Sequence, residues 1–217
     1  MNKKIYLFLS ALLFSCSAQK NNTKIDPIEI PVESSLNKVE NDIVNDFLAA
    51  ELKKDRYINY KDFEITIIEE ALKKIKAVES YSYSYNERIA MNKNNKVSKM
   101  ESIYFLDSLQ IKKMELELKD EPIYHWKISD FTKTKVKLLK TEELRKIINS
   151  GSYTNPPYRL IIQLSRPLII DTDKALISFD IGNSQFGYGG INHFTALVKK
   201  VNNKWEQNGY YFDGVFY

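Results

Sequence analysis

Apolar residues near position 40 recur every three or four positions, as they do on one face of a helix. Asn37 and Glu40, at the start of this stretch, have the spacing of a capping box. A second stripe follows Asp62, a residue type that caps helix N-termini. The two stripes consist of Val39, Ile43, Phe47 and Leu52, and of Ile65, Ile68, Leu72, Ile75 and Val78. The pattern predicts two amphipathic helices in the first part of the chain.

Strict alternation marks three further segments, and a period of two is typical of a strand. These are 81–85, where tyrosine alternates with serine, 114–118, where methionine and leucine alternate with glutamate, and 133–138, where lysine alternates with other residues. Lysine along a strand is typical of an exposed sheet edge. After this edge strand, Thr141 precedes a short helical segment, 142–149, which Gly151 ends.

The last third of the chain predicts a β-meander. Apolar or alternating runs lie at 160–164, 175–181, 191–200 and 204–211. Asn202-Asn203 supplies a tight turn before the last run. Because helices come first and strands last, the order favours an α+β fold over a parallel α/β sheet. We therefore expect N-terminal helices packed on an antiparallel sheet that ends in a C-terminal β-meander.

The first 16 residues have the organisation of an export signal. Lys3 and Lys4 precede an apolar run, 5–13, which is far shorter than the roughly 20 residues that a membrane-spanning helix needs. The run ends in Leu13-Phe14-Ser15-Cys16, and Cys16 is the only cysteine of the chain. This segment resembles the lipobox of bacterial lipoproteins, although Phe14 is bulkier than the residue usual at its position.

The resemblance implies cleavage between Ser15 and Cys16 and acyl chains such as palmitate on Cys16. Several acyl chains anchor a protein far more firmly than one chain does. We expect three parts: a lipoprotein signal peptide (1–15), the lipidated cysteine with a flexible tether (16–35), and a single α+β domain (36–217). The expected location is the bacterial cell envelope, at the outer membrane. The domain is expected to face the periplasm, because no acidic residue closely follows Cys16.

The charge of the chain argues against nucleic acid as a partner. The formal net charge is +4, and the loss of Lys3 and Lys4 with the signal peptide lowers it to +2, which is close to balance. Hydrophobic residues make up 43% of the chain, enough for a core of its own. Because Cys16 is expected to be lipidated, the domain must be stable without a disulfide.

The strongest catalytic candidate is His193, with Asp180 or Asp213 as its partner. His193 and Asp180 lie at the two ends of a glycine-rich loop, and Asp213 lies near the C-terminus. A histidine in an open cleft about 3.2 Å from a carboxylate has the geometry of a general base. The alternative is a partly buried histidine with a structural role. The sequence contains neither HExxH nor CxxC, and it indicates neither a metal site nor a cofactor.

The strongest binding candidates are Tyr81, Tyr83 and Tyr85. On a strand, three such rings share one face, roughly 7 Å apart. A row of this kind can stack on a sugar or hold a peptide, since each ring has an apolar face and a polar hydroxyl. The alternative is that the tyrosines cover the flank of a helix.

Three classes of function remain open. A lipid-anchored, non-catalytic binding or accessory domain agrees with the anchor and the tyrosines, with the membrane and a glycan or protein as partners. An envelope hydrolase or isomerase would use His193 with Asp180 or Asp213. An inhibitor or immunity-type protein would instead expose a large apolar patch.

Overall fold

A computed structural model describes residues 36–93, 104–151, 156–187 and 190–214. The chain divides into two units, Met1–Val32 and Glu33–Tyr217, and all described residues belong to the second. The expected signal peptide, the lipidated Cys16 and the tether lie outside the described residues.

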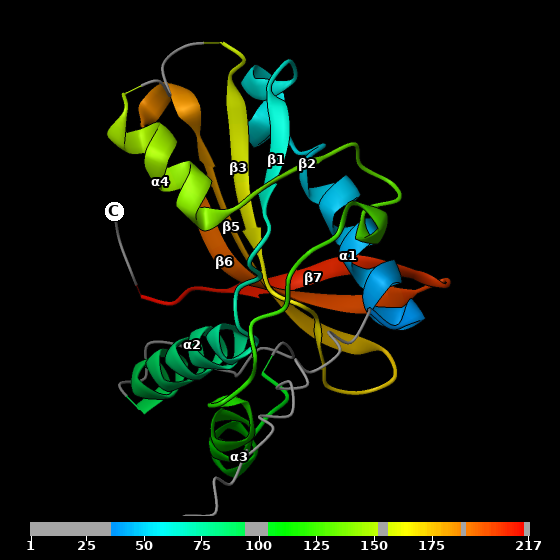
Figure 1. The fold of residues 1–217 in the computed structure, drawn as a ribbon. Coiled ribbons are helices and arrows are strands. Elements are labelled where there is room, and N and C mark those ends of the chain that lie inside the picture. The colour runs from blue at the N-terminus through cyan, green and yellow to red at the C-terminus, as the bar shows by residue number, and fades with distance from the viewer. Residues whose placement is uncertain (1–35, 94–103, 152–155, 188–189, 215–217) are drawn as a thin grey trace, which may run out of the picture. The chain divides into compact units, whose positions relative to one another are not determined.

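The described part of the chain contains both helices and strands (Figure 1). The α-helices are α1 (Lys38–Glu51), α2 (Ile75–Lys93), α3 (Ser108–Leu118) and α4 (Thr141–Asn149). Short 3₁₀ helices are η1 (Asp55–Tyr60), η2 (Ile128–Asp130) and η4 (Ser184–Phe186). The strands are β1 (Glu64–Ile68), β2 (Lys137–Leu139), β3 (Arg159–Leu164), β4 (Leu168–Ile169), β5 (Lys174–Asn183), β6 (Gly190–Val201) and β7 (Lys204–Tyr211).

The described strands form one seven-stranded mixed sheet in the order β2-β1-β3-β5-β6-β7, with β4 paired to β5. The expected α+β class is confirmed, and β5, β6 and β7 form the expected antiparallel meander. The expectation of a wholly antiparallel sheet is wrong, because β1 pairs in parallel with both β2 and β3. Parallel neighbours need a long crossover connection, and the segment between β1 and β3 contains α2, α3 and α4.

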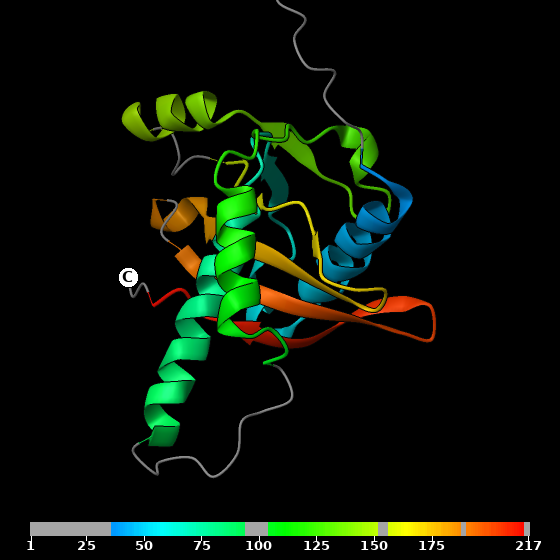
Figure 2. The same cartoon turned by 90° about the horizontal axis from the view of Figure 1, so that it is seen from below.

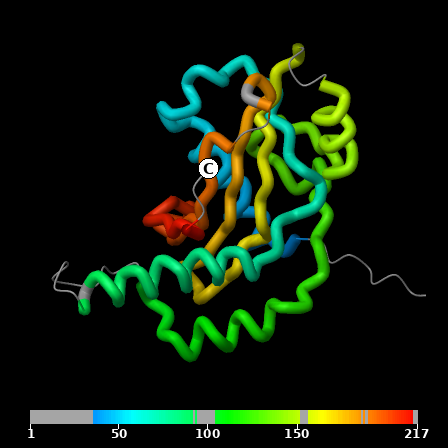
Figure 3. Tube along the Cα trace, turned by 90° about the vertical axis from the view of Figure 1, so that its left-hand side faces the viewer, coloured from blue at the N-terminus to red at the C-terminus, as the bar shows by residue number. Residues whose placement is uncertain are grey.

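The two faces of the sheet are covered by different helices (Figure 2). Alternate residues of a strand point to opposite faces, so Ile177 and Phe179 of β5 pack with Phe47 of α1, whereas Leu176 packs with Tyr81 of α2. Helices α2 and α3 run side by side on the second face (Figure 3). The two faces therefore present separate surroundings for any site.

The predictions for the first helix and for the last turn are confirmed. Asn37 and Glu40 form the capping box of α1, with each side chain accepting from the other residue's backbone N–H. Asn202 and Asn203 have φ angles of 48° and 63°, the left-handed pair that a two-residue hairpin turn requires. The predicted helix at 142–149 is also present, as α4.

Three predictions of secondary structure are wrong. The second stripe is not one helix: residues 64–68 form β1 because Glu-Ile-Thr-Ile-Ile is dense in β-branched residues, which favour strands. Segments 81–85 and 114–118 are parts of helices α2 and α3, where residues four apart share a face and the short alternation is incidental. Of 133–138, the structure makes a strand only from Lys137 onward, at the sheet edge as expected.

Candidate functional site

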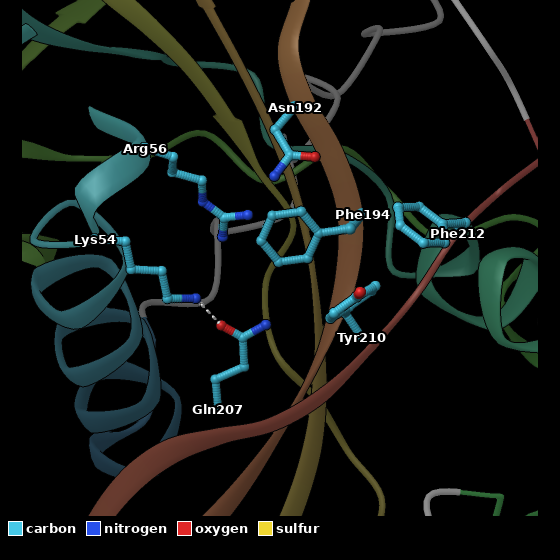
Figure 4. A pocket seen from close by; sticks show the side chains of 7 residues that line it. All are labelled: Lys54, Arg56, Asn192, Phe194, Gln207, Tyr210 and Phe212. Atoms are coloured by element: carbon cyan, nitrogen blue, oxygen red, sulfur yellow. Dashed lines mark hydrogen bonds between the residues drawn. The ribbon is translucent and has the colours of Figure 1, made fainter. Parts of the chain in front are cut away.

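A pocket of about 360 Å³ opens beside β6 and β7, on the face of the sheet that α1 covers (Figure 4). Its lining combines two cations, two amides and three aromatic rings. They come from the segment after α1, from β6, and from β7 with the residue following it. The lining residues are Lys54, Arg56, Asn192, Phe194, Gln207, Tyr210 and Phe212.

Strand geometry explains how β6 and β7 contribute to the pocket. Asn192 and Phe194 are two positions apart on β6, so both point to the same face. Gln207 and Tyr210 are three apart and would lie on opposite faces of a regular strand. The pairing of β6 with β7 shifts between Leu197 and Val198, where the extra residue of a bulge returns Tyr210 to the face of Gln207.

The two cations are held by a carboxylate beneath the pocket. The Glu51 side chain, in the last turn of α1, is fully buried and accepts hydrogen bonds from Lys54, Arg56 and the Tyr57 hydroxyl, the last at 2.9 Å. Lys54 also donates to the Gln207 side-chain oxygen (Figure 4). Burial, with the adjacent charge of Glu51 as the second cause, raises the pKa of the Tyr57 hydroxyl far above its ordinary value. Tyr57 therefore remains a hydrogen-bond donor at physiological pH.

The aromatic residues form a wall from the floor of the pocket to its rim. The Phe194 and Tyr210 ring centroids lie 6.2 Å apart, and those of Tyr210 and Phe212 lie 5.0 Å apart, both pairs edge to face. Phe194 is buried, whereas Tyr210 and Phe212 are 53% and 50% exposed. The Arg56 guanidinium lies 5.4 Å from the Phe194 ring centroid. The positive charge of Arg56 thus lies directly beside the aromatic wall of the pocket.

The sequence-predicted histidine lies on the other face of the sheet. His193 Nδ1 is 3.2 Å from Asp213, and the His193 side chain is 16% exposed. Asp180 lies opposite His193 in the β5–β6 register, but its Oδ2 pairs with Lys76 of α2 at 2.7 Å. The structure therefore brings all three predicted residues together and places Asp213 at the distance expected of a partner for His193.

A second pocket, of about 420 Å³, lies next to this histidine. Asp213 contributes to its lining together with residues of α2 and of the turn before it, namely Lys73, Lys76, Glu79 and Ser80. Its lining contains both positive and negative side chains, and His193 is not among the lining residues. The distance required of a general base is met here, and the imidazole is 16% exposed.

The predicted row of tyrosines is not a row, because these residues belong to helix α2. Tyr81 is fully buried, and its hydroxyl accepts from the backbone N–H groups of Phe105 and Leu106 at 2.7 Å each. Tyr85, one turn later, stacks on Tyr81 at a centroid distance of 6.3 Å. Tyr83 points elsewhere and lies against Gly214, where an added Cβ would come within 2.5 Å of the ring. The three rings therefore cannot act as one stacking platform.

The residues of the first pocket were not identified from the sequence. The cluster Lys53-Lys54-Asp55-Arg56 is visible in the sequence, but nothing there indicates that it meets β7, about 150 positions later along the chain. The exposure of Tyr210 and Phe212 depends on a bulge that the alternation pattern does not show. This pocket is a finding of the structure alone.

Within the four described stretches, no group of three or more His, Cys, Asp or Glu side chains is arranged to hold a metal ion. Among the same residues, none of the helices combines the length and apolar character that crossing a membrane requires. No protein-family model matches the chain, and neither a curated protein nor a solved structure matches it.

Proposed function

We propose that this chain is a lipid-anchored protein of the bacterial envelope whose folded domain binds a small molecule in the pocket beside β6 and β7. The observation that supports binding is the lining of this pocket. Half-exposed aromatic rings stand beside cationic and amide side chains, in a cavity of about 360 Å³. A cavity of this size that combines aromatic rings with a few convergent polar groups is typical of a small-molecule site.

The proposed anchor depends on the lipobox at Leu13-Phe14-Ser15-Cys16. Wild-type protein expressed in a bacterium should incorporate labelled palmitate, and a Cys16→Ser variant should incorporate none because the thiol is the acceptor. Label in the Cys16→Ser variant would contradict the anchor. The outer-membrane location facing the periplasm is tested separately, by fractionation and by protease protection of intact cells.

The binding role is tested with a small aromatic probe, 3-phenylpropanamide, on the full chain in detergent. Saturation-transfer NMR reports the contact between the probe ring and the protein, and a detergent blank corrects for partition into micelles. At the ligand efficiencies usual for small molecules, we expect a Kd of about 1 mM.

The matched variants for this test are Tyr210→Ala and Leu109→Ala. Tyr210 lines the pocket, whereas Leu109 is 78% exposed on α3 and lines none of the pockets described above. Transfer should fall in the first variant and stay unchanged in the second. If both variants behave like the wild type, the pocket does not bind the probe and the proposed role is wrong.

A second candidate function is an envelope hydrolase or isomerase, favoured by the 3.2 Å contact between His193 and Asp213. In that case the protein should hydrolyse p-nitrophenyl acetate faster than buffer does, and His193→Asn should abolish the excess rate. His125→Asn is the matched control, since His125 contacts Glu69 at 3.3 Å, away from this pair. Equal rates for the two variants would rule out a catalytic role for His193 in this reaction.

A further inference from the structure

We infer that the ligand of the pocket beside β6 and β7 is an organic acid with an aromatic or apolar body. The acid group would be bound by Arg56 and Lys54, and the body would lie against Phe194, Tyr210 and Phe212. This inference depends on the proposed binding function and adds the chemical class of the ligand.

The charges around the pocket select for an anion. Glu51 is the acidic side chain bound to the two cations, and it is fully buried beneath them. Two positive charges and one negative charge leave one unit of positive charge facing the cavity. The lining itself contains no acidic side chain among the described residues. An anion entering the cavity gains from this excess, whereas a cation would be repelled.

The cations retain donors for a ligand. A guanidinium has five N–H donors, and the structure shows one bond from Arg56, to Glu51. An ammonium has three, and Lys54 uses two of them, on Glu51 and Gln207. The Lys54 and Arg56 side chains are 38% and 39% exposed, so both remain accessible from the cavity. The planar fork of Arg56 suits a carboxylate in particular, because two parallel N–H groups match its two oxygens.

The position of Arg56 relative to the aromatic wall limits the shape of the ligand. Its guanidinium carbon is 5.4 Å from the centre of the Phe194 ring, at the floor, and the wall continues through Tyr210 to Phe212. An acid group bound at Arg56 therefore lies within a few bonds of the surface that the apolar body covers. A short linker between acid and ring satisfies both contacts, whereas a purely polar anion would leave the exposed rings uncovered.

The pocket next to His193 does not share this character. Its lining includes Lys73 and Lys76, but also Glu79 and Asp213. Lys76 is paired with Asp180 at 2.7 Å, and Asp213 contacts His193. Because its positive and negative groups balance, this second pocket gives no preference for an anion.

The test compares two nearly isosteric probes, 3-phenylpropanoate and 3-phenylpropanamide, on the full chain in detergent. They differ in charge at the head group and share the same ring. We expect the acid to bind about tenfold more tightly than the amide, the difference typical of a hydrogen bond that becomes charge-assisted. Rising salt concentration should weaken binding of the acid and leave binding of the amide unchanged.

Two variants locate the preference at the cations. Arg56→Gln removes the fork, and Gln207→Glu puts a negative charge into the lining. The second change keeps an oxygen acceptor for Lys54, so folding should be preserved even where Arg56→Gln is destabilised. Each variant should weaken binding of the acid about tenfold more than it weakens binding of the amide.

The outcomes separate this inference from the proposed function. If both probes bind equally, or if Gln207→Glu leaves the acid unaffected, the pocket binds small molecules but the inferred acid class is wrong. If neither probe binds the wild type, the proposed function itself fails. If the wild type binds the acid more tightly than the amide and Gln207→Glu abolishes this difference, both the proposed function and the inferred acid class are supported.

Discussion

The Glu51 carboxylate contributes both to the stability of the fold and to the charge of the pocket. Glu51→Gln should therefore lower the free energy of unfolding and strengthen anion binding. In the folded protein the carboxylate accepts three hydrogen bonds, from Lys54, Arg56 and Tyr57. Glutamine keeps the shape and one acceptor oxygen but removes the charge. A hydrogen bond to a charged group contributes about 1 kcal/mol more than a neutral one.

Three such bonds give about 3 kcal/mol as an upper value. Lys54 and Arg56 are more than a third exposed and regain water when their partner loses its charge, so their share is reduced by about half. We therefore expect a loss of about 2 kcal/mol in the free energy of unfolding. For a domain of this size, the melting temperature should fall by about 4–8 °C.

Near-UV circular dichroism during a thermal melt measures this change, since aromatic side chains surround the site. The control is Glu142→Gln, because Glu142 is well exposed on α4 and pairs with the exposed Arg145 at 3.4 Å. Its effect should stay below about 0.5 kcal/mol. The same Glu51→Gln protein should bind 3-phenylpropanoate more tightly, because the opposing negative charge has gone. If Glu51→Gln and the control have the same melting temperature, or if Glu51→Gln binds 3-phenylpropanoate more weakly than the wild type, the reasoning on charge is refuted.

Two further predictions concern the core. Burial raises the pKa of four tyrosine hydroxyls, so the folded chain retains protons that the unfolded chain releases above about pH 10. The contribution of these tyrosines to stability is constant below that pH, and the melting temperature should fall as the pH rises above it. A phenolate absorbance at pH 11 equal in folded and urea-unfolded protein would contradict this; the residues are Tyr57, Tyr81, Tyr124 and Tyr211. Asn45→Ala should cost about 2–4 kcal/mol in urea unfolding, because the buried Asn45 accepts from the Thr132 and Lys133 N–H groups and donates to the Asp130 carbonyl. A loss below about 1 kcal/mol would show that these bonds contribute little.

Local signals in the sequence predicted the elements that depend on local chemistry. The capping box at Asn37 and the Asn202-Asn203 turn were predictable because their backbone groups are satisfied within three or four residues. The meander was predictable because consecutive strands usually pair. Strand β1 was missed because its partners β2 and β3 are far away in the sequence. In addition, a strand of five residues shows too few periods to outweigh a coincidental helical spacing.

The candidate site likewise contains residues that could be predicted from local sequence and residues that could not. Asp180 was a predicted partner of His193 because a hairpin brings the two ends of its loop together, and the structure places these two residues opposite each other. Asp213, the alternative partner, lies 3.2 Å from His193. The tyrosine segment was assigned to a strand from five residues, although Ala77, Val78, Tyr81 and Tyr85 have helical spacing. The anion-selective lining could not be predicted, because it combines a contact across the fold with a β-bulge.

The most direct test of the account is a crystal structure of the protein with 3-phenylpropanoate. We predict that its carboxylate lies within hydrogen-bond distance of the Arg56 guanidinium, with its ring against Phe194 and Tyr210. A molecule bound elsewhere, or one whose ring points away from this wall while its carboxylate faces solvent, would contradict the central claim that this pocket binds organic acids.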